Sequence, residues 1–212
     1  MKKAVSAFFD KYAVDFNAIY GGKNGVFHNL INECFRKAMK LRFIKTIEGC
    51  CPVEGKTVID IGCGAGHYSV ALAKAGALRV YGIDFAQGML DLAGRSAAQA
   101  HVDHICTFHK GDFTTDPIPG DFDYAVLMGL MDYIREPKAL IQKVLSITKS
   151  KVFFSFPAGG GILAWQRKLR YMNRCDLFFY NKEQIYKLFQ GMRYKDLVVE
   201  DIGRDFFVTV LL

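Results

Sequence analysis

The chain contains 212 residues, of which 51% are hydrophobic and 23% are charged. These proportions are ordinary for a folded globular protein and exclude an intrinsically disordered chain, which buries too little apolar surface to fold. The net charge of +7 is compatible with an acidic small molecule, a nucleic acid or an anionic membrane surface, and it does not choose among them. A chain of this length favours one core over two small ones, so we expect a single domain over residues 1–212.

The N-terminal region, residues 1–50, is predicted to be an amphipathic helical cover. Apolar residues recur there with helical spacing at Phe27, Ile31, Cys34, Ala38 and Leu41. Asp10, Lys11 and Asp15 interrupt the stretch in which a signal peptide needs a continuous apolar core. No apolar run reaches the roughly 18 residues that a membrane span needs. We therefore expect a cytoplasmic protein.

From residue 57 onward, β-branched and aromatic runs alternate with helical patterns, which predicts βαβ units and a parallel sheet. The expected strands are 57–62, 79–84, 105–109, 122–128, 151–156, about 194–201 and 206–212, and the expected helices lie near 67–75, 87–99, 137–148 and 181–190. Only the four residues "IGRD" join the last two strands, too few for a parallel crossover, so these strands should form an antiparallel hairpin. The predicted fold is α/β, a doubly wound seven-stranded sheet with an antiparallel edge hairpin.

Residues 157–180 interrupt the alternation after the fifth strand and are predicted to form a lid-like insert. The chain then divides into a cover at 1–50, a ligand-binding core at 51–156, this insert, and the end of the sheet at 181–212. Within the insert, "WQRKLRYMNR" interleaves basic and aromatic side chains. That pattern is compatible with a solvated helix whose aromatic residues cover a pocket, with RNA binding, or with an anionic membrane surface.

The stretch "VIDIGCGAG", residues 58–66, places a glycine loop directly after the first strand. In an open α/β sheet, ligands bind beyond the carboxyl ends of the strands. Gly62, Gly64 and Gly66 follow GxGxG spacing, and His67 stands where the dinucleotide fingerprint GxGxxG requires its third glycine. This disfavours an NAD-dependent enzyme. The helix expected near His67 offers its N-terminus to a carboxylate, such as that of an amino acid.

Acidic residues also follow the second and third strands. Asp84 can accept hydrogen bonds from two ribose hydroxyl groups and would repel an additional phosphate there. Asp112 can accept from an adenine amino group, with Phe113 bordering the ring. Met89 is placed to lie against the adenine, although a methionine in an amphipathic helix is often a core residue. The alternative is that the acids only cap strands and turns.

Four stretches, "VIDIGCGAG", "VYGIDFAQGM", "GDF" and "FDYAVLMGLMDYI", occur in this order. Through them, residues 57 to about 156 resemble the class I S-adenosylmethionine-dependent methyltransferases. The resemblance implies a Rossmann-like fold and S-adenosylmethionine as the cofactor. It places the methionine part near the glycine loop and the carbonyl of Met128, the ribose at Asp84, and the adenine at Asp112. The predicted cofactor-binding residues are Asp60, Gly62, Cys63, Gly64, Asp84, Phe85, Met89, Asp112, Phe113 and Met128.

Methyl transfer from a sulfonium is an in-line displacement that depends mainly on positioning and on the exclusion of water. Asp132 and Tyr133 follow the fourth strand and are candidates for orienting or deprotonating the acceptor; otherwise Asp132 caps a turn and Tyr133 packs. The flanks show a weaker resemblance to the magnesium protoporphyrin IX O-methyltransferases, in which Tyr20 of "IYG" would be a third active-site residue. Asp132 stands where that family has a histidine, and an acid is a poor neighbour for a carboxylate acceptor.

Other classes of site are disfavoured. The prolines form neither an NPPY-like nor a Pro-Cys motif, which argues against two routes of DNA base methylation. "HVDH" at 101–104 has no third ligand at metal-binding spacing, so no metal site is predicted. The six cysteines include no CxxC pair and are expected to be reduced thiols.

The sequence predicts a methyltransferase for a small or medium-sized acceptor in a covered pocket. The alternatives are an RNA methyltransferase that uses the basic aromatic insert, and a protein that binds S-adenosylmethionine without catalysis. The oligomeric state stays open.

Overall fold

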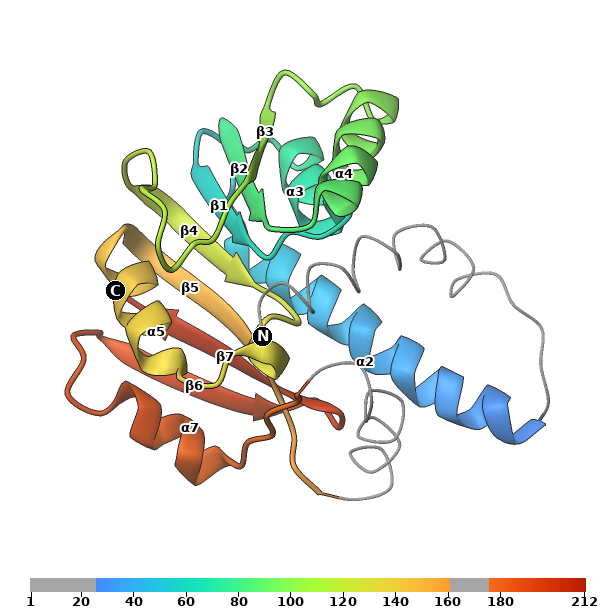
Figure 1. The fold of residues 1–212 in the computed structure, drawn as a ribbon, viewed down its shortest axis with the longest axis vertical. Helices are drawn as coiled ribbons and strands as arrows, with labels where there is room; N and C mark the ends of the chain where they lie inside the picture. The colour runs from blue at the N-terminus through green and yellow to red at the C-terminus, as the bar shows by residue number, and fades with distance from the viewer. Residues whose placement is uncertain (1–25, 161–175) are drawn as a thin grey trace.

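The computed structural model describes residues 26–160 and 176–212 (Figure 1). Tyr20 and most of the predicted insert therefore lie outside the described residues. The helices are α2 (Val26–Cys50), α3 (His67–Lys74), α4 (Gln87–Gln99), the short 3-10 helix η1 (Met131–Tyr133), α5 (Pro137–Ser146) and α7 (Lys182–Phe189). The strands are β1 (Thr57–Ile61), β2 (Arg79–Asp84), β3 (Cys106–Lys110), β4 (Phe122–Leu127), β5 (Thr148–Pro157), β6 (Asp196–Asp201) and β7 (Asp205–Leu211).

The seven strands form one sheet in the order β3-β2-β1-β4-β5-β7-β6. The first five are parallel, whereas β7 pairs antiparallel with both β5 and β6. The predicted doubly wound fold with an antiparallel hairpin is confirmed. The strand order reverses between β1 and β4, so the carboxyl ends of these strands form the edge at which a ligand is expected.

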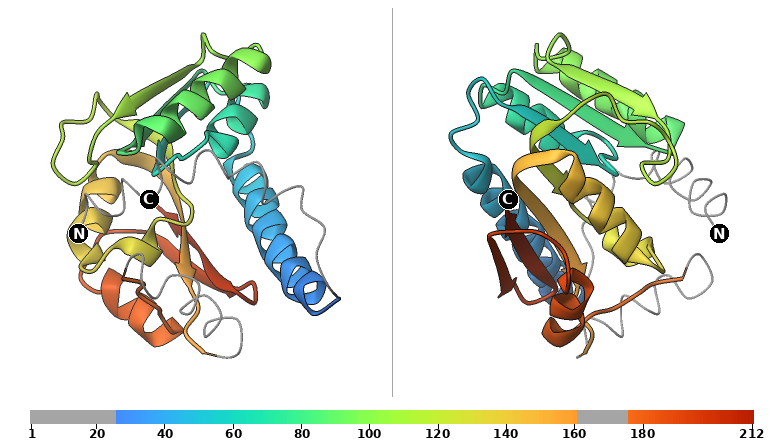
Figure 2. Two further views of the ribbon diagram at one scale, coloured as in Figure 1. Left: turned by 45° about the vertical axis from the view of Figure 1, so that its right-hand side comes forward. Right: turned by 90° about the vertical axis from the view of Figure 1, so that its left-hand side faces the viewer.

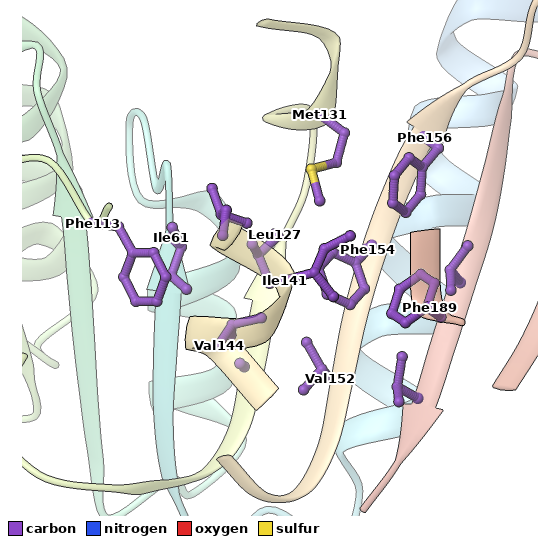
Figure 3. Close-up of a cluster of buried hydrophobic side chains, with 14 of the residues drawn as sticks. Ile61, Phe113, Leu127, Met131, Ile141, Val144, Val152, Phe154, Phe156 and Phe189 are labelled. Atoms are coloured by element: carbon purple, nitrogen blue, oxygen red, sulfur yellow. The ribbon is translucent and has the colours of Figure 1, made fainter. Parts of the chain in front are cut away.

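Helices cover both faces of the sheet, with α5 and α7 on one face and α2, α3 and α4 on the other (Figure 2). The two faces have separate cores because successive strand residues point to opposite sides. Along β5, Phe154 and Phe156 pack with Ile141 of α5 and Phe189 of α7 (Figure 3). Phe153 packs on the other face with residues from α2, α3 and α4.

The buried face of α2 differs from the predicted apolar stripe. Ala38 is buried as expected, but Leu41 is only half-buried. Arg42 and Thr46 are buried instead, which continues the spacing of four residues from Ala38. A helix normally turns its apolar side inward, so a buried arginine requires partners. These partners lie at the ligand edge and are described below.

Candidate functional site

Asp84, the last residue of β2, fixes the shape of the ligand edge. One oxygen of its carboxylate, Oδ2, accepts a hydrogen bond of 2.9 Å from the backbone N–H of Gly64. The other, Oδ1, accepts a bond of 2.9 Å from the N–H of Ala86. Asp84 thus joins the glycine loop to the residue preceding α4. A carboxylate oxygen can accept more than one hydrogen bond, so both oxygens keep the capacity to accept ligand hydroxyl groups.

The glycine loop makes a tight turn that only glycine tolerates. Gly66 has a φ of +76°, and a Cβ atom there would lie 2.9 Å from the Cβ of Ala93 in α4. Gly62 has a φ of +71° and lies against Leu130. An L side chain rarely adopts this conformation. The turn brings the N-terminus of α3 to the ligand edge, with His67 as its first residue.

The buried Asp60 supports this turn from behind. Its side chain accepts a 2.6 Å hydrogen bond from the hydroxyl of Ser69, in the first turn of α3. Burial raises the pKa of Asp60 to about 7, although bonds from the side chain and backbone of Ser69 work in the opposite direction. Helix α3 has no capping side chain of its own. Asp60 therefore satisfies N-terminal groups of α3 from the neighbouring strand.

A cavity of about 360 Å³ opens beside Asp84, which is within the usual range for small-molecule sites. Its lining is largely apolar, and it brings together residues that are far apart in the chain. They are Ile61, Gly62, Ile83, Asp84, Phe85, Gly111, Asp112, Phe113, Thr114, Leu130, Tyr133, Ile134, Arg135, Glu136, Ala139 and Leu140. Six of the residues predicted for the site are in this set, namely Gly62, Asp84, Phe85, Asp112, Phe113 and Tyr133.

The loop after β3 forms one wall of the cavity. Oδ1 of Asp112 accepts bonds from both the backbone N–H and the hydroxyl of Thr114. Lys143 of α5 donates to the carbonyl oxygen of Phe113 and, at 2.7 Å, to that of Asp116. Its ammonium nitrogen also lies 4.9 Å from the centre of the Phe113 ring. The loop is therefore held in one shape, with the almost fully buried Phe113 beside Ile61 (Figure 3).

Four other predicted cofactor residues, together with Asp60, are not among those that line the cavity. Met89 is buried with Ala65 and Ala86, which favours the core interpretation of its side chain. Cys63 is buried, and its sulfur lies against Gly82. Burial raises the pKa of the Cys63 thiol well above its usual value. Gly64 contributes its backbone N–H to Asp84, and the Met128 side chain belongs to the core beneath α2 and α3.

The candidate catalytic residues occupy different environments. Tyr133 lines the cavity, whereas Asp132 is only 2% exposed. The backbone carbonyl of Asp132 accepts a 2.9 Å bond from the N–H of Phe178, which fixes η1 against the chain leading to α7. Burial together with the charge of Asp132 raises the pKa of Tyr180 to about 12. Tyr20, the third candidate, lies outside the described residues.

Sequence reasoning missed a buried network centred on Arg42 of α2. Its Nε donates to the Tyr68 hydroxyl at 3.1 Å, and its Nη1 lies 3.3 Å from Ser155 Oγ and 3.4 Å from Asp205 Oδ2. Ser155 Oγ also accepts a 2.7 Å bond from the N–H of Gly129, just after β4. The one sequence signal was an arginine on the same helical face as Ala38.

Residues after Tyr133 were also missed. Ile134, Arg135 and Glu136 line the cavity together with the loop after β3, and Leu130, which precedes η1, also lines it and lies against Gly62. Their position directly after the fourth strand, at the edge where ligands bind, was the available signal. Their residue types alone do not indicate a ligand site, so only their place in the fold marks them.

Residues 58–151 match the family model described as a methyltransferase domain. Through these residues the chain is similar to the class I S-adenosylmethionine-dependent methyltransferases. This similarity supports S-adenosylmethionine as the cofactor. The cavity fits the adenosine part of this group, because Asp84 can accept from ribose hydroxyl groups beside an apolar space for the base.

Curated relatives of this chain include a ubiquinone biosynthesis O-methyltransferase of Neisseria meningitidis serogroup C (strain 053442). It is 32% identical over 114 residues, which cover 51% of this chain and 47% of the relative. The protein of the same name from Coxiella burnetii (strain Dugway 5J108-111) is also 32% identical over 114 residues, which cover 53% of this chain and 48% of the relative. The chain spans about half the length of the curated relatives it matches.

Solved structures with the same fold cover more of the chain. Magnesium protoporphyrin IX methyltransferase from Synechocystis PCC 6803, with bound S-adenosylhomocysteine, has a TM-score of 0.75 and 21% identity, covering 100% of this chain and 99% of that one. A putative O-methyltransferase from Nostoc punctiforme has a TM-score of 0.73 and 13% identity, covering 96% of this chain and 60% of that one. At these identities the likeness concerns the fold.

Further features of the structure bear on the other predictions. In residues 26–160 and 176–212, no three His, Cys, Asp or Glu side chains gather as a metal site. Cys50, Cys51, Cys63 and Cys106 are free thiols. Over the same described part of the chain, none of the helices combines the length and the apolar character that crossing a membrane requires.

Proposed function

We propose that this methyltransferase transfers the methyl group of S-adenosylmethionine to a hydroxyl oxygen of a small or medium-sized molecule. The observation that carries the proposal is the cavity in which Asp84 and Asp112 lie on the nucleotide side and Tyr133 lines the same space. The names of the curated relatives, which are O-methyltransferases, support oxygen as the acceptor atom.

In this proposal the cofactor supplies an electrophilic methyl group, and the residues of the chain bind and orient it. Asp84 accepts hydrogen bonds from the ribose, while Phe113, Leu130 and Ile134 enclose the base in apolar surroundings. The glycine loop and the N-terminus of α3 receive the carboxylate of the methionine part. Enclosing the reacting groups excludes water, and the fixed edge holds them in line.

Asp132, Tyr133 and Tyr20 are proposed to orient the acceptor. A hydroxyl group can donate a hydrogen bond to a carboxylate or a phenol oxygen, whereas an acceptor carboxylate would be repelled by the acids at this end of the sheet. These acids are Asp84, Asp132 and Asp205. We therefore propose a hydroxyl group rather than a carboxylate as the acceptor.

The organisation and location of the protein stay proposals that rest on the sequence. They are a single domain over residues 1–212, with a cover at 1–50 and a lid-like insert at 157–180, in the cytoplasm. The comparisons give no support to RNA as the acceptor, and the basic stretch that motivated it, residues 165–174, lies outside the described residues.

The test is to incubate the purified protein with S-adenosylmethionine labelled in its methyl group and an extract of its host, and then to separate small molecules, lipids, RNA and protein. We expect label in the small-molecule or lipid fraction, lost when excess S-adenosylhomocysteine is added. Mild alkali then identifies the acceptor group, because a methyl ether survives and a methyl ester releases methanol. Label in RNA, or in alkali-labile esters, would contradict the proposal. Cofactor binding without any labelled product would indicate a binding-only protein.

A further inference from the structure

The Arg42 network lies at the half of the ligand edge away from the nucleotide. Asp84 ends β2, and the loop holding Asp112 follows β3; both strands lie on one side of β1. Ser155 and Asp205 belong to β5 and β7, on the other side of β4. A cofactor with its ribose at Asp84 and its methionine part at the glycine loop would extend from β2 toward β1, the strand next to β4 at the point where the strand order reverses.

Tyr68 connects the two halves. It is the second residue of α3, immediately after the glycine loop, and its ring lies 5.4 Å from the ring of Phe43 in α2. It is half-buried and is not among the residues that line the nucleotide cavity. The side chain is therefore held between the cofactor loop and α2, on the side toward β4 and β5.

The hydrogen bond from Arg42 sets the direction of the Tyr68 hydroxyl. Nε of Arg42 donates to the phenol oxygen at 3.1 Å, so that oxygen is the acceptor in this bond. A phenol oxygen also carries one hydrogen of its own, which must point away from the guanidinium. Burial raises the pKa of Tyr68 in spite of the nearby Arg42, which keeps that hydrogen on the oxygen at neutral pH.

Arg42 itself is fixed by the rest of the network. Asp205 and Ser155 hold Nη1, and Ser155 Oγ also accepts from the N–H of Gly129. Arg42 thus connects α2 with residues at the ends of β4, β5 and β7. A guanidinium presents donors in a fixed plane, so these contacts determine where Nε points.

We propose that Tyr68 binds the methyl acceptor by donating a hydrogen bond to one of its oxygen atoms, and that Arg42 is a positioning residue that orients the Tyr68 hydroxyl. This inference rests on the proposed function and adds two residues to its acceptor site. The hydroxyl of Tyr68 contributes to binding the acceptor, while the cofactor is bound by other groups.

The first test compares Tyr68→Phe with Tyr186→Phe, a matched removal of a hydroxyl from an exposed tyrosine of α7. Initial rates of methyl transfer are measured over a dilution series of the active extract fraction. For Tyr68→Phe, we expect about a fivefold rise in the half-saturating amount of extract, as for one lost hydrogen bond. Its affinity for S-adenosylhomocysteine, measured by calorimetry, should change by less than about twofold. Tyr186→Phe should behave as the unmodified protein.

The second test uses Arg42→Lys, which keeps a positive charge near Asp205 but lacks the planar set of donors. If Arg42 acts through Tyr68, the double variant Arg42→Lys/Tyr68→Phe should need no more extract than the more affected single variant. A merely structural role would lower the melting temperature without this coupling. Should Arg42→Lys fail to fold, Tyr68→Phe alone still decides the role of the hydroxyl.

The outcomes separate this inference from the proposed function. Absence of transfer by the unmodified protein contradicts both. Transfer by the unmodified protein with an unchanged extract requirement in Tyr68→Phe overturns the inference alone. Equal losses of acceptor and S-adenosylhomocysteine binding also overturn it, because Tyr68 would then hold the cofactor.

Discussion

The two halves of the ligand edge are built in different ways. One half contains Asp84 and Asp112 and is called the nucleotide half. There, each of these acids bonds to a residue two positions further along the chain, Ala86 and Thr114 respectively. The other half, which contains Arg42, Ser155 and Asp205, is called the transfer half. There, Arg42 bonds across 113 residues to Ser155 and across 163 residues to Asp205. The first half combines local turns with contacts of shorter sequence separation, such as that between Asp84 and Gly64, whereas the second depends on contacts between distant parts of the chain.

This difference separates ligand binding from stability. Side chains of the nucleotide half order their own loops through bonds to nearby backbone groups. The transfer half contains charged groups removed from water, and these tolerate the loss of a partner poorly. Substitutions in the nucleotide half should therefore act mainly on cofactor affinity, and those in the transfer half on folding.

The largest effect is expected for Asp84→Ala. This change removes the acceptor of the ribose hydroxyl groups, each charge-assisted bond being worth about 1.5–3 kcal/mol. Affinity for S-adenosylhomocysteine, measured by calorimetry, should fall about a thousandfold. Asp103→Ala, at an exposed position, is the control and should bind normally. A loss of less than about tenfold in Asp84→Ala would remove Asp84 from the cofactor site.

The next effect tests the transfer half with two acids of the same hairpin, each paired with a cation of α2. Asp205 pairs with Arg42 at side-chain exposures of 5% and 11%, whereas Glu200 pairs with Lys45 at 41% and 30%. Asp205→Ala should lower the free energy of unfolding by about 3 kcal/mol, because a buried cation loses its partner. Glu200→Ala should lower the free energy of unfolding by only about 0–1 kcal/mol, because this ion pair is exposed to solvent. Equal losses of unfolding free energy in the two variants, measured by urea denaturation, would contradict the expected difference between the buried and the exposed ion pair.

A smaller effect tests the backbone of the nucleotide half. Gly66→Ala combines a positive φ with a contact of 2.9 Å to Ala93, whereas Gly120→Ala has a φ of +80° but nothing within 4 Å. We expect losses of about 2 kcal/mol at Gly66 and about 1 kcal/mol at Gly120. Chemical denaturation of both variants measures the difference. Equal losses of unfolding free energy in the two variants would mean that α4 can move away from residue 66 without a cost in free energy.

The elements that the sequence predicted well are those with strong local signals. Residues 79–84 and 87–99 are strand β2 and helix α4 as expected, because alternating and helical periodicities change sharply between them. The terminal hairpin followed from the short "IGRD" connection. Strand β5 is longer than predicted, beginning at Thr148, because its first residues pair with β4 across a register shift that no local pattern marks.

The residues of the candidate site also divide into those that a local sequence signal reveals and those that it does not. Asp84 and Asp112 were visible because acids that end parallel strands meet at one edge. Arg42 was not, since its burial follows from Ser155 and Asp205, more than a hundred residues away. Sequence reasoning also placed Asp60 beside the cofactor on the strength of its motif, but could not show that its side chain bonds to Ser69.

Asp60 gives the smallest expected effect, and it appears as a dependence on pH. Burial raises the pKa of Asp60 from 3.8 to about 7, so between these values the folded protein keeps a proton that the unfolded chain releases. Stability should therefore fall as pH rises through this window. Asp60→Asn lacks this titration while keeping an oxygen for Ser69. Between pH 5 and pH 7, unfolding free energy should fall in the unmodified protein by roughly 1–2 kcal/mol more than in the variant.

Ser69→Ala is the matched variant for this pH dependence. The bonds from Ser69 lower the pKa of Asp60, so losing the hydroxyl should extend the fall in stability to higher pH. Urea denaturation at closely spaced pH values measures all three proteins. Parallel profiles for the unmodified protein and Asp60→Asn would mean that Asp60 is already ionised when folded at pH 5. Helix α3 would then be capped by a charged group, and the nucleotide half would contain a buried charge of the kind that distinguishes the transfer half.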